Sequence, residues 1–160
     1  MKAIIMVVLI SICSSSFASC ELTPEQRSVM LFAYSYGKPH DYGYTMVAIA
    51  MEESDLGRWN INLYDPSAGP WHVTIDKAVD KLGWDHTKYN YNRAAQILAD
   101  DIYLSAAIAL ETLLWWDKVR DGNWREVVSS YNGGWKGNDE YLNRIIANIK
   151  KIKECDWIKE

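Results

Sequence analysis

Three short groups of polar residues in this chain could do chemistry, and the first of them contains a carboxyl group. Glu53-Ser54 follows an apolar stretch, residues 67–72 read Ser-Ala-Gly-Pro-Trp-His, and residues 131–134 read Tyr-Asn-Gly-Gly. A carboxyl group at the edge of an apolar core is partly desolvated, which raises its pKa. Such a group can hold a proton near neutral pH and donate it to a leaving oxygen, so Glu53 is a candidate general acid.

Two other interpretations of the acidic group stay open. Glu52 competes with Glu53, because the two side chains lie about 100° apart on one helix and the helical pattern does not choose between them. Glu53 also fits an ordinary surface residue near a helix end, with Glu52 and Asp55 as solvated neighbours.

The other two groups add hydrogen-bonding side chains and glycines. His72 can donate or accept a hydrogen bond and titrates near neutral pH, although an ordinary loop histidine would look the same. Gly69 permits close approach of the backbone. The Gly133-Gly134 pair ends a helix, so Tyr131 and Asn132 lie at that helix end; the alternative is a buried tyrosine followed by a turn.

The elements that position these groups are predicted to be helices. Thr23 can cap a first helix, Gln26 completes a capping box, and Gly37 ends the helix. A second helix over about 44–56 is nearly all apolar, as a central buried helix would be, and Gly57 ends it.

The rest of the chain continues the helical pattern after one long connection. Residues 58–73 read as an irregular loop, and long ordered loops are often functional. Four more helices are expected: 74–82; 93–119, capped by Asn90 or Asn92 and broken near Asp100; a helix capped by Asn123 and ending near 131; and an amphipathic helix over 139–152. Strand-like alternation is scarce, so the expected fold class is all-α.

The first nineteen residues have the form of a secretory signal peptide. Lys2 is followed by an almost wholly apolar stretch over 3–12 and by small residues over 14–18, with cleavage expected near Ala18/Ser19. The apolar stretch is shorter than the ~20 residues of a membrane span; a retained anchor or a buried helix is the alternative. The expected organisation is a signal peptide over 1–19, one domain over 20–160 and no membrane span in the mature form.

The cysteines bear on where the chain resides. Cys20 and Cys155 remain after the signal is removed, and an even pair in an exported protein indicates a disulfide. Residues 17–20 also form a degraded lipobox that would place a lipid anchor on Cys20. The disulfide is preferred, because the lipobox lacks its usual leucine and a lipid would leave Cys155 unpaired. The expected location is the periplasm.

The composition argues against several function classes. The formal net charge of -4 makes the chain a poor candidate for binding nucleic acid. The three histidines lack metal-ligand spacing and no glycine-rich phosphate loop is present, so neither a metal nor a cofactor is expected. Eight Trp and ten Tyr against two Phe suit sugar stacking as well as core packing.

The tryptophans divide between two expected environments. Three fall in or beside the candidate cleft loops and are candidates for stacking on sugars: Trp59, Trp71 and Trp135. Four have a helical context and are expected in the core: Trp84, Trp115, Trp116 and Trp124. Of these, Trp115 and Trp116 are adjacent and cannot face the same way.

The order and spacing of the three groups resemble those of the soluble lytic transglycosylases, glycoside hydrolase family 23, whose fold is shared with goose-type lysozymes. The family pattern is an apolar helix ending in Glu-Ser, a Ser-x-Gly-Leu-Met-Gln loop and an Ala-Tyr-Asn-Ala-Gly segment. The resemblance spans roughly residues 44–146 and includes the helical stretch 98–117. The chain departs from the pattern at Pro70, Trp71 and His72, where Leu, Met and Gln are common.

The resemblance implies an all-α, lysozyme-like single domain that cleaves the glycan strands of peptidoglycan. In the family a single glutamate acts as acid and base between N-acetylmuramic acid and N-acetylglucosamine and leaves 1,6-anhydromuramoyl ends. It implies Glu53 as the catalytic residue and a set of substrate-binding or cleft-forming residues: Ser54, Gly69, Trp71, His72, Tyr131 and Asn132. A role in a phage or in a secretion system of the envelope would suit so small a domain.

Two other functions fit the same resemblance. A lysozyme-type muramidase, which is a hydrolase, would need a second carboxylate to position water, and Asp55 or Asp65 is the candidate. A non-catalytic glycan-binding or inhibitory protein, such as a phage superinfection-exclusion protein, is favoured by the altered residues 70–72.

Overall fold

The computed structural model describes residues 20–62 and 64–159. The signal peptide expected over 1–19 lies outside the described residues, as do Leu63 and Glu160. Within the described ranges, no helix is both long enough and apolar enough to span a bilayer.

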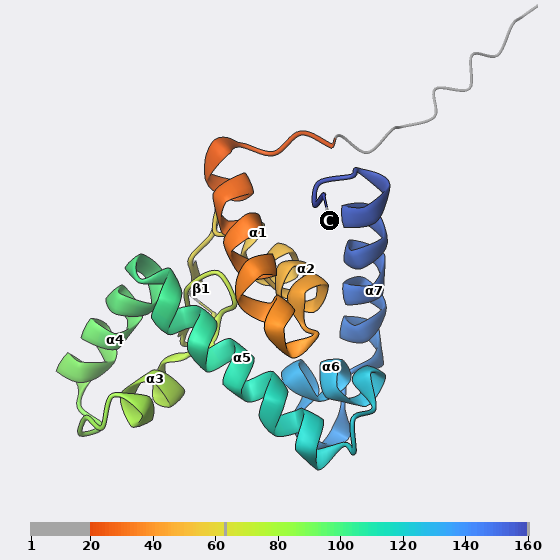
Figure 1. Ribbon diagram of the computed structural model, residues 1–160. Coiled ribbons are helices and arrows are strands. Elements are labelled where there is room, and N and C mark those ends of the chain that lie inside the picture. The colour runs from red at the N-terminus through yellow and green to blue at the C-terminus, as the bar shows by residue number, and fades with distance from the viewer. Residues whose placement is uncertain (1–19, 63, 160) are drawn as a thin grey trace, which may run out of the picture.

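The described chain is mostly helical, as expected, with one small antiparallel sheet (Figure 1). The α-helices are α1 Pro24–Gly37, α2 Gly43–Ser54, α3 Ile75–Lys81, α4 Lys88–Asp100, α5 Ile102–Val119, α6 Trp124–Gly133 and α7 Asp139–Glu154. Two 3₁₀ helices are η1 Lys38–His40 and η2 Gly134–Lys136. The strands are β1 Ile61–Asn62, β2 Ser67–Ala68 and β3 Val73–Thr74, in the order β1-β2-β3.

Helix α2 is the centre of the core. It packs between α1 and α7, and α5 runs diagonally across the molecule from α4 to α6 (Figure 1). Residues 45–50 of α2 are all buried, which agrees with its nearly continuous apolar sequence. A helix enclosed in this way cannot rotate about its axis, so the direction of each side chain in its last turn is fixed.

Local signals in the sequence account for several helix ends. Thr23 and Gln26 form the predicted capping box at the start of α1. The predicted break near Asp100 falls at Asp101, whose carboxylate accepts from two backbone N–H groups and begins α5. One predicted cap was wrong, because Thr87 rather than Asn90 or Asn92 caps α4. Asn123 occupies the predicted N-cap position of α6, but its side chain bonds Glu126 and makes no capping hydrogen bond.

The segment predicted as an irregular loop, residues 58–73, contains β1, β2 and the first residue of β3. Ile61 pairs with Ala68, and Ala68 pairs with Val73. Each strand is two residues long, too short to give an alternating pattern in the sequence. The sheet lies next to the end of α2 and fixes the path of the turn that contains His72.

The predicted disulfide between Cys20 and Cys155 is present, with a Cα–Cα distance of 5.5 Å. It joins the segment before α1 to the residue after α7. The indole of Trp157 donates a hydrogen bond of 2.7 Å to the carbonyl oxygen of Cys20 and ties the same two segments together.

Replacing both cysteines with serine should lower the free energy of unfolding by about 4 kcal/mol, because the crosslink restricts the unfolded chain over a long loop. The sequence separation that it closes is 135 residues. Urea denaturation of the oxidised wild type and of the double variant measures the difference. Wild-type protein treated with a reductant should unfold like the double variant; an unchanged midpoint after verified reduction would contradict the prediction.

Candidate active site

Glu53 lies in the last turn of α2 and lines a cavity of about 220 Å³. Its side chain is only 17% exposed, so the carboxyl group sits at the edge of the core, as the sequence predicts. The residues around it come from the sheet, α3, α5 and α6: Asn62, Asp65, Ser67, His72, Val73, Thr74, Lys77, Thr112, Tyr131 and Asn132. The other two sequence groups, 67–72 and 131–134, therefore meet Glu53 at one cavity.

Tyr141 is the closest partner of Glu53, and it was not among the predicted site residues. Its hydroxyl group donates a hydrogen bond of 2.8 Å to Oε1 of Glu53 from the first turn of α7. Burial first, and then the charge of Glu53, raise the pKa of Tyr141, so the phenol keeps its proton and remains a donor. The available signal was a tyrosine on an otherwise aliphatic helix face, since a buried tyrosine hydroxyl needs a polar partner.

His72 approaches the other oxygen of the same carboxyl group. Its Nδ1 atom lies 3.5 Å from Oε2 of Glu53, and its Nε2 atom lies 2.8 Å from the carbonyl oxygen of Trp59. A carbonyl oxygen only accepts, so Nε2 carries a hydrogen in either charge state. The neutral imidazole then presents its Nδ1 lone pair to Glu53. The imidazolium, which is protonated at Nδ1 as well, instead directs an N–H group towards Oε2 of Glu53.

The backbone turns sharply to aim His72 at Glu53. His72 has φ of 42°, a left-handed conformation that costs a non-glycine residue ~1–2 kcal/mol. Its N–H donates to the carbonyl oxygen of Gly69, which closes the turn. Strain of this kind persists only where surrounding contacts hold it, and it is common at functional sites.

Electrostatics at His72 favour its charged form. Burial alone would lower the pKa of His72, but the hydrogen bonds to Glu53 and to the Trp59 carbonyl, with the charges of Glu53 and Asp65, raise it above the ordinary value. The cation is therefore stabilised by the fold.

Glu52 points elsewhere, which separates the two acidic candidates. Its carboxyl group pairs with the guanidinium of Arg144 and accepts from the side chain of Asn148, both on α7. It does not line the cavity. Neighbouring side chains on a helix point about 100° apart, so Glu52 contacts α7 while Glu53 lines the cavity.

Ser54 does not contact the cavity, contrary to its predicted role. The residue is 1% exposed, and its hydroxyl group lies 2.8 Å from the carbonyl oxygen of Pro70. The Oγ atom of Ser54 also accepts a hydrogen bond of 2.8 Å from the N–H of Gly57. Ser54 therefore joins the end of α2 to the turn that carries His72, and positions that turn rather than a substrate.

Trp71 and Gly69 are also structural in this arrangement. Trp71 has no exposed surface, and its indole N–H donates to the carbonyl oxygen of Met46 at 2.9 Å, so the expected stacking of Trp71 on a sugar was wrong. Gly69 has φ of 80°, and a Cβ there would lie 2.3 Å from Oγ of Ser105. The backbone does approach another group closely at Gly69, as predicted, but that group is Ser105 of α5.

Tyr131 and Asn132 both line the cavity from the end of α6. The hydroxyl group of Tyr131 donates to the carbonyl oxygen of Trp71 at 3.3 Å, and its ring lies parallel to that of Tyr141. The side-chain oxygen of Asn132 accepts from Asn138 at 2.8 Å. Tyr131 therefore supports Tyr141 and the turn, while Asn132 is an exposed polar group at the rim.

Two further charged residues line the cavity. Asp65 is exposed there, whereas Asp55 forms an ion pair with Arg58 at 3.6 Å and does not line it. Lys77 is an exposed residue of α3, and partial desolvation of its ammonium group lowers its pKa. No carboxylate of the described residues lies within ion-pair distance of Lys77.

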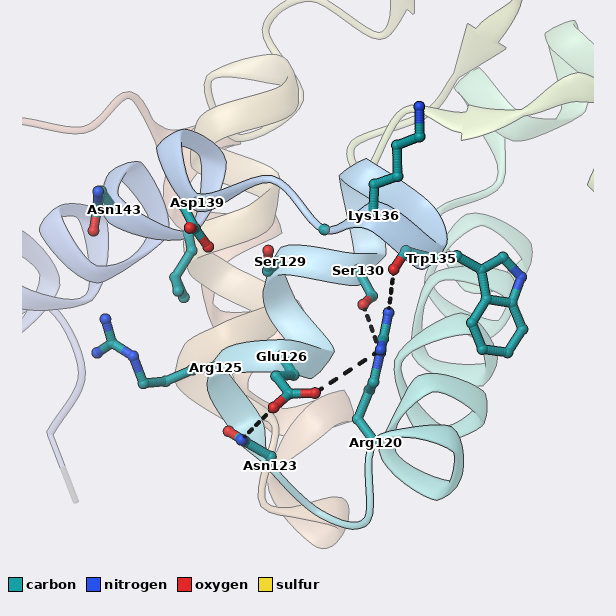
Figure 2. Close-up of a pocket in the computed structure, with 12 residues that line it drawn as sticks. Arg120, Asn123, Arg125, Glu126, Ser129, Ser130, Trp135, Lys136, Asp139 and Asn143 are labelled. Atoms are coloured by element: carbon teal, nitrogen blue, oxygen red, sulfur yellow. Dashed lines mark hydrogen bonds and ion pairs between the residues drawn. The ribbon is translucent and has the colours of Figure 1, made fainter.

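A larger cavity of about 610 Å³ lies on the other face of α6 (Figure 2). Its most enclosed cation, Arg120, donates to Oγ of Ser130 at 3.0 Å and to the carbonyl oxygen of Trp135 at 2.8 Å. Glu126 lies 3.9 Å from the same guanidinium group. The charged groups of this larger cavity already bond one another, and neither Tyr131 nor Asn132 lines it. We therefore place the candidate site at Glu53.

The described residues contain no cluster of three or more His, Cys, Asp or Glu side chains that could hold a metal ion. In comparisons with known proteins, no protein-family model matches the chain, and neither a curated protein nor a solved structure matches it. The geometry around Glu53 and the order of the three sequence groups are therefore what bears on function.

Replacing Tyr141 with phenylalanine should lower the free energy of unfolding by about 2 kcal/mol, because the partly buried carboxyl group of Glu53 loses the hydrogen bond that the phenol donates to it. Tyr131→Phe is the matched control. Its hydroxyl bond is longer and ends on a neutral carbonyl, so that variant should lose less. Equal losses in the two urea denaturation curves would contradict the assignment.

Replacing His72 with glutamine should lower the free energy of unfolding below that of the wild type at acidic pH. At alkaline pH the free energies of unfolding of the two proteins should differ less. The pKa of His72 is raised on folding, so its contribution is complete below the ordinary value of ~6.5 and is lost as pH rises through the raised pKa. Denaturation of both proteins from pH 5 to pH 9 measures this.

The partner of His72 can be tested in the same experiment. In a Glu53→Gln background the pH-dependent part of the difference should shrink, because the neutral amide no longer favours the imidazolium. A difference that keeps its full pH dependence in that background would exclude Glu53 as the partner.

Proposed function

We propose that this chain is an exported lytic transglycosylase that cleaves the glycan strands of peptidoglycan, with Glu53 as acid and then base. One observation carries the proposal: Glu53, His72 and the 131–132 pair, from three separate segments, line one cavity. The mostly helical domain, with an acidic residue at the end of a buried helix, supports the finer assignment of a lysozyme-like fold. The disulfide supports an oxidising location such as the periplasm.

The first step of the proposed reaction breaks the glycosidic bond. The protonated carboxyl group of Glu53 donates its proton to the oxygen between N-acetylmuramic acid and N-acetylglucosamine, and the C–O bond to the anomeric carbon breaks. Glu53 is left as a carboxylate. The hydroxyl group of Tyr141, 2.8 Å from Oε1, stabilises that charge until the second step.

The second step restores the carboxyl group. The muramoyl 6-hydroxyl attacks the anomeric carbon, a new C–O bond closes the 1,6-anhydro ring, and the hydroxyl proton passes to Glu53. No water is consumed and one carboxyl group suffices. His72, whose Nδ1 atom lies 3.5 Å from Oε2, can return a proton to the Glu53 carboxylate between turnovers.

The departures at residues 70–72 weigh less against catalysis than the sequence alone indicates. Pro70 and Trp71 are buried and shape the turn from inside the fold. Only His72 reaches the cavity, and it replaces the hydrogen-bonding glutamine of the family with another hydrogen-bonding side chain. A non-catalytic glycan-binding or superinfection-exclusion protein therefore draws little support from these three positions.

A lysozyme-type hydrolase is the second candidate, because Asp65 lines the cavity together with Glu53. In that reaction a second carboxylate would direct a water molecule to the anomeric carbon. The two reactions differ in product mass, since hydrolysis adds one water molecule to each cleaved bond and transglycosylation adds none.

Replacing Glu53 with glutamine should reduce the release of soluble fragments from purified peptidoglycan by roughly 1000-fold, because the amide cannot transfer a proton. Mass spectrometry of the fragments identifies the reaction, and 1,6-anhydromuramoyl ends are the expected product. Glu52→Gln is the matched control: it removes a carboxyl group one residue away that lies outside the cavity, and should keep activity within a few-fold.

Three results would change the assignment. Full activity in Glu53→Gln would refute Glu53 as the acid. Products heavier by one water molecule would establish the hydrolase. Intact strands with folded wild-type protein, together with measurable binding, would establish a non-catalytic glycan-binding protein.

A further inference from the structure

A second, apolar cavity adjoins the Glu53 cavity along α5. Its volume is about 630 Å³, and residues of α3 and α5 line it, with Trp115 and Trp116 among them. Lys77 of α3 and Thr112 of α5 line both cavities. The two cavities therefore meet at these residues, and a linear molecule bound at Glu53 has a path into the apolar one.

The exposed tryptophans at this end of the molecule are held in place. Trp115 is 49% exposed and Trp135 is 69% exposed, so the expected core position of Trp115 was wrong. Both rings contact the buried Trp116 edge to face, at centroid distances of 4.5 and 5.2 Å. The surface presented is rigid and aromatic, in contrast to a single exposed ring on a mobile loop.

Arg120 fixes this arrangement from behind. Its guanidinium group lies over the rings of Trp116 and Trp135, at 5.3 and 5.6 Å from their centroids. It also donates to the carbonyl oxygen of Trp135 and to Ser130, as Figure 2 shows. The ring of Trp135 points away from the polar cavity of Figure 2 and towards α5. Ordering an exposed indole in this way reduces the entropy lost when a ligand stacks on it.

Polar groups surround the aromatic surface in a pattern that suits a sugar. Lys81 and Glu111 form an ion pair of 2.8 Å at the edge of the apolar cavity, where each can bond hydroxyl groups. Lys77 stands at the junction without a carboxylate partner among the described residues. An unpaired ammonium group beside an aromatic surface fits a ligand that carries both a ring with an apolar face and a carboxylate.

We propose that the apolar cavity is an extension of the glycan-binding cleft, in which Trp115 stacks on a sugar ring remote from the cleaved bond and Lys77 pairs with a carboxylate carried by the muramoyl residue. This inference rests on the proposed function, because it takes the strand bound at Glu53 as its ligand. Two features distinguish the resulting site: it requires a strand long enough to cross the junction, and it prefers strands that carry carboxylates.

Strand length provides the first test. Isothermal titration calorimetry in the Glu53→Gln background compares soluble peptidoglycan fragments of one and of three disaccharide units without turnover. Trp115→Ala should weaken binding of the long fragment about tenfold and leave the short fragment unchanged, as loss of one stacking contact predicts. Trp115→Tyr should restore most of the affinity. Tyr89→Ala, on α4 and outside both cavities, removes an aromatic residue that is 71% exposed and should change neither value.

Charge provides the second test. Lys77→Met should weaken binding of the long muramoyl fragment and leave chitohexaose, which has no carboxylate, unaffected; Lys77→Arg should retain both affinities. Equal effects of Trp115→Ala on short and long fragments, or equal effects of Lys77→Met on both polymers, would overturn the extended site while the proposed function stands. Failure of the Glu53→Gln protein to bind any of these glycans would overturn the proposed function and the extension together.

Discussion

Because α2 is buried, Glu52 and Glu53 in its last turn each need a hydrogen-bonding partner. Residues 45–50 are enclosed by α1 and α7, so the helix has one rotational setting and its last turn lies at the boundary of the core. A carboxylate left there without hydrogen bonds would cost several kcal/mol. Glu52 meets Arg144 and Glu53 meets Tyr141, both on α7, so the docking of one helix satisfies both charges.

The same constraint explains the strained backbone around the site. The chain leaves α2 through three successive left-handed residues, Asp55, Leu56 and Gly57, and His72 is left-handed as well. Each non-glycine residue in this conformation costs ~1–2 kcal/mol. The hydroxyl group of Ser54 and the indole of Trp71 tie these segments to α2 and offset the strain. The result is an imidazole held against Glu53 by contacts that are almost entirely inside the fold.

Local chemistry was predictable from the sequence, and long-range contacts were not. The Thr23 capping box and the break near Asp101 depend on neighbours a few residues away, and they were found. The disulfide followed from a count of two cysteines. The preference for Glu53 over Glu52 came from the resemblance, and of the two only Glu53 lines the cavity.

Most of the missed features depend on which way a side chain points in the folded chain. Trp71 was expected at the surface and is buried, because the turn after Gly69 directs it at Met46. Trp115 was expected in the core and is half exposed, because its neighbour Trp116 takes the inward position. Tyr141 was recognised as an apolar-face residue, but its partner lies 88 residues earlier, where no local pattern could indicate it. Strands of two residues leave no periodicity to detect.

The distance along the chain between Glu53 and Tyr141 also orders the assembly of the site in time. A chain is made from its N-terminus, so α2 exists for the whole interval in which α3 to α6 are synthesised, and its acidic residues then have no α7 to contact. Closing a loop of this length is entropically unfavourable until the intervening core has formed. The Cys20–Cys155 crosslink joins segments that meet only after α7 has docked. In a partly made chain Glu53 therefore lacks its hydrogen bond from Tyr141, which forms only when α7, the last helix, docks against α2.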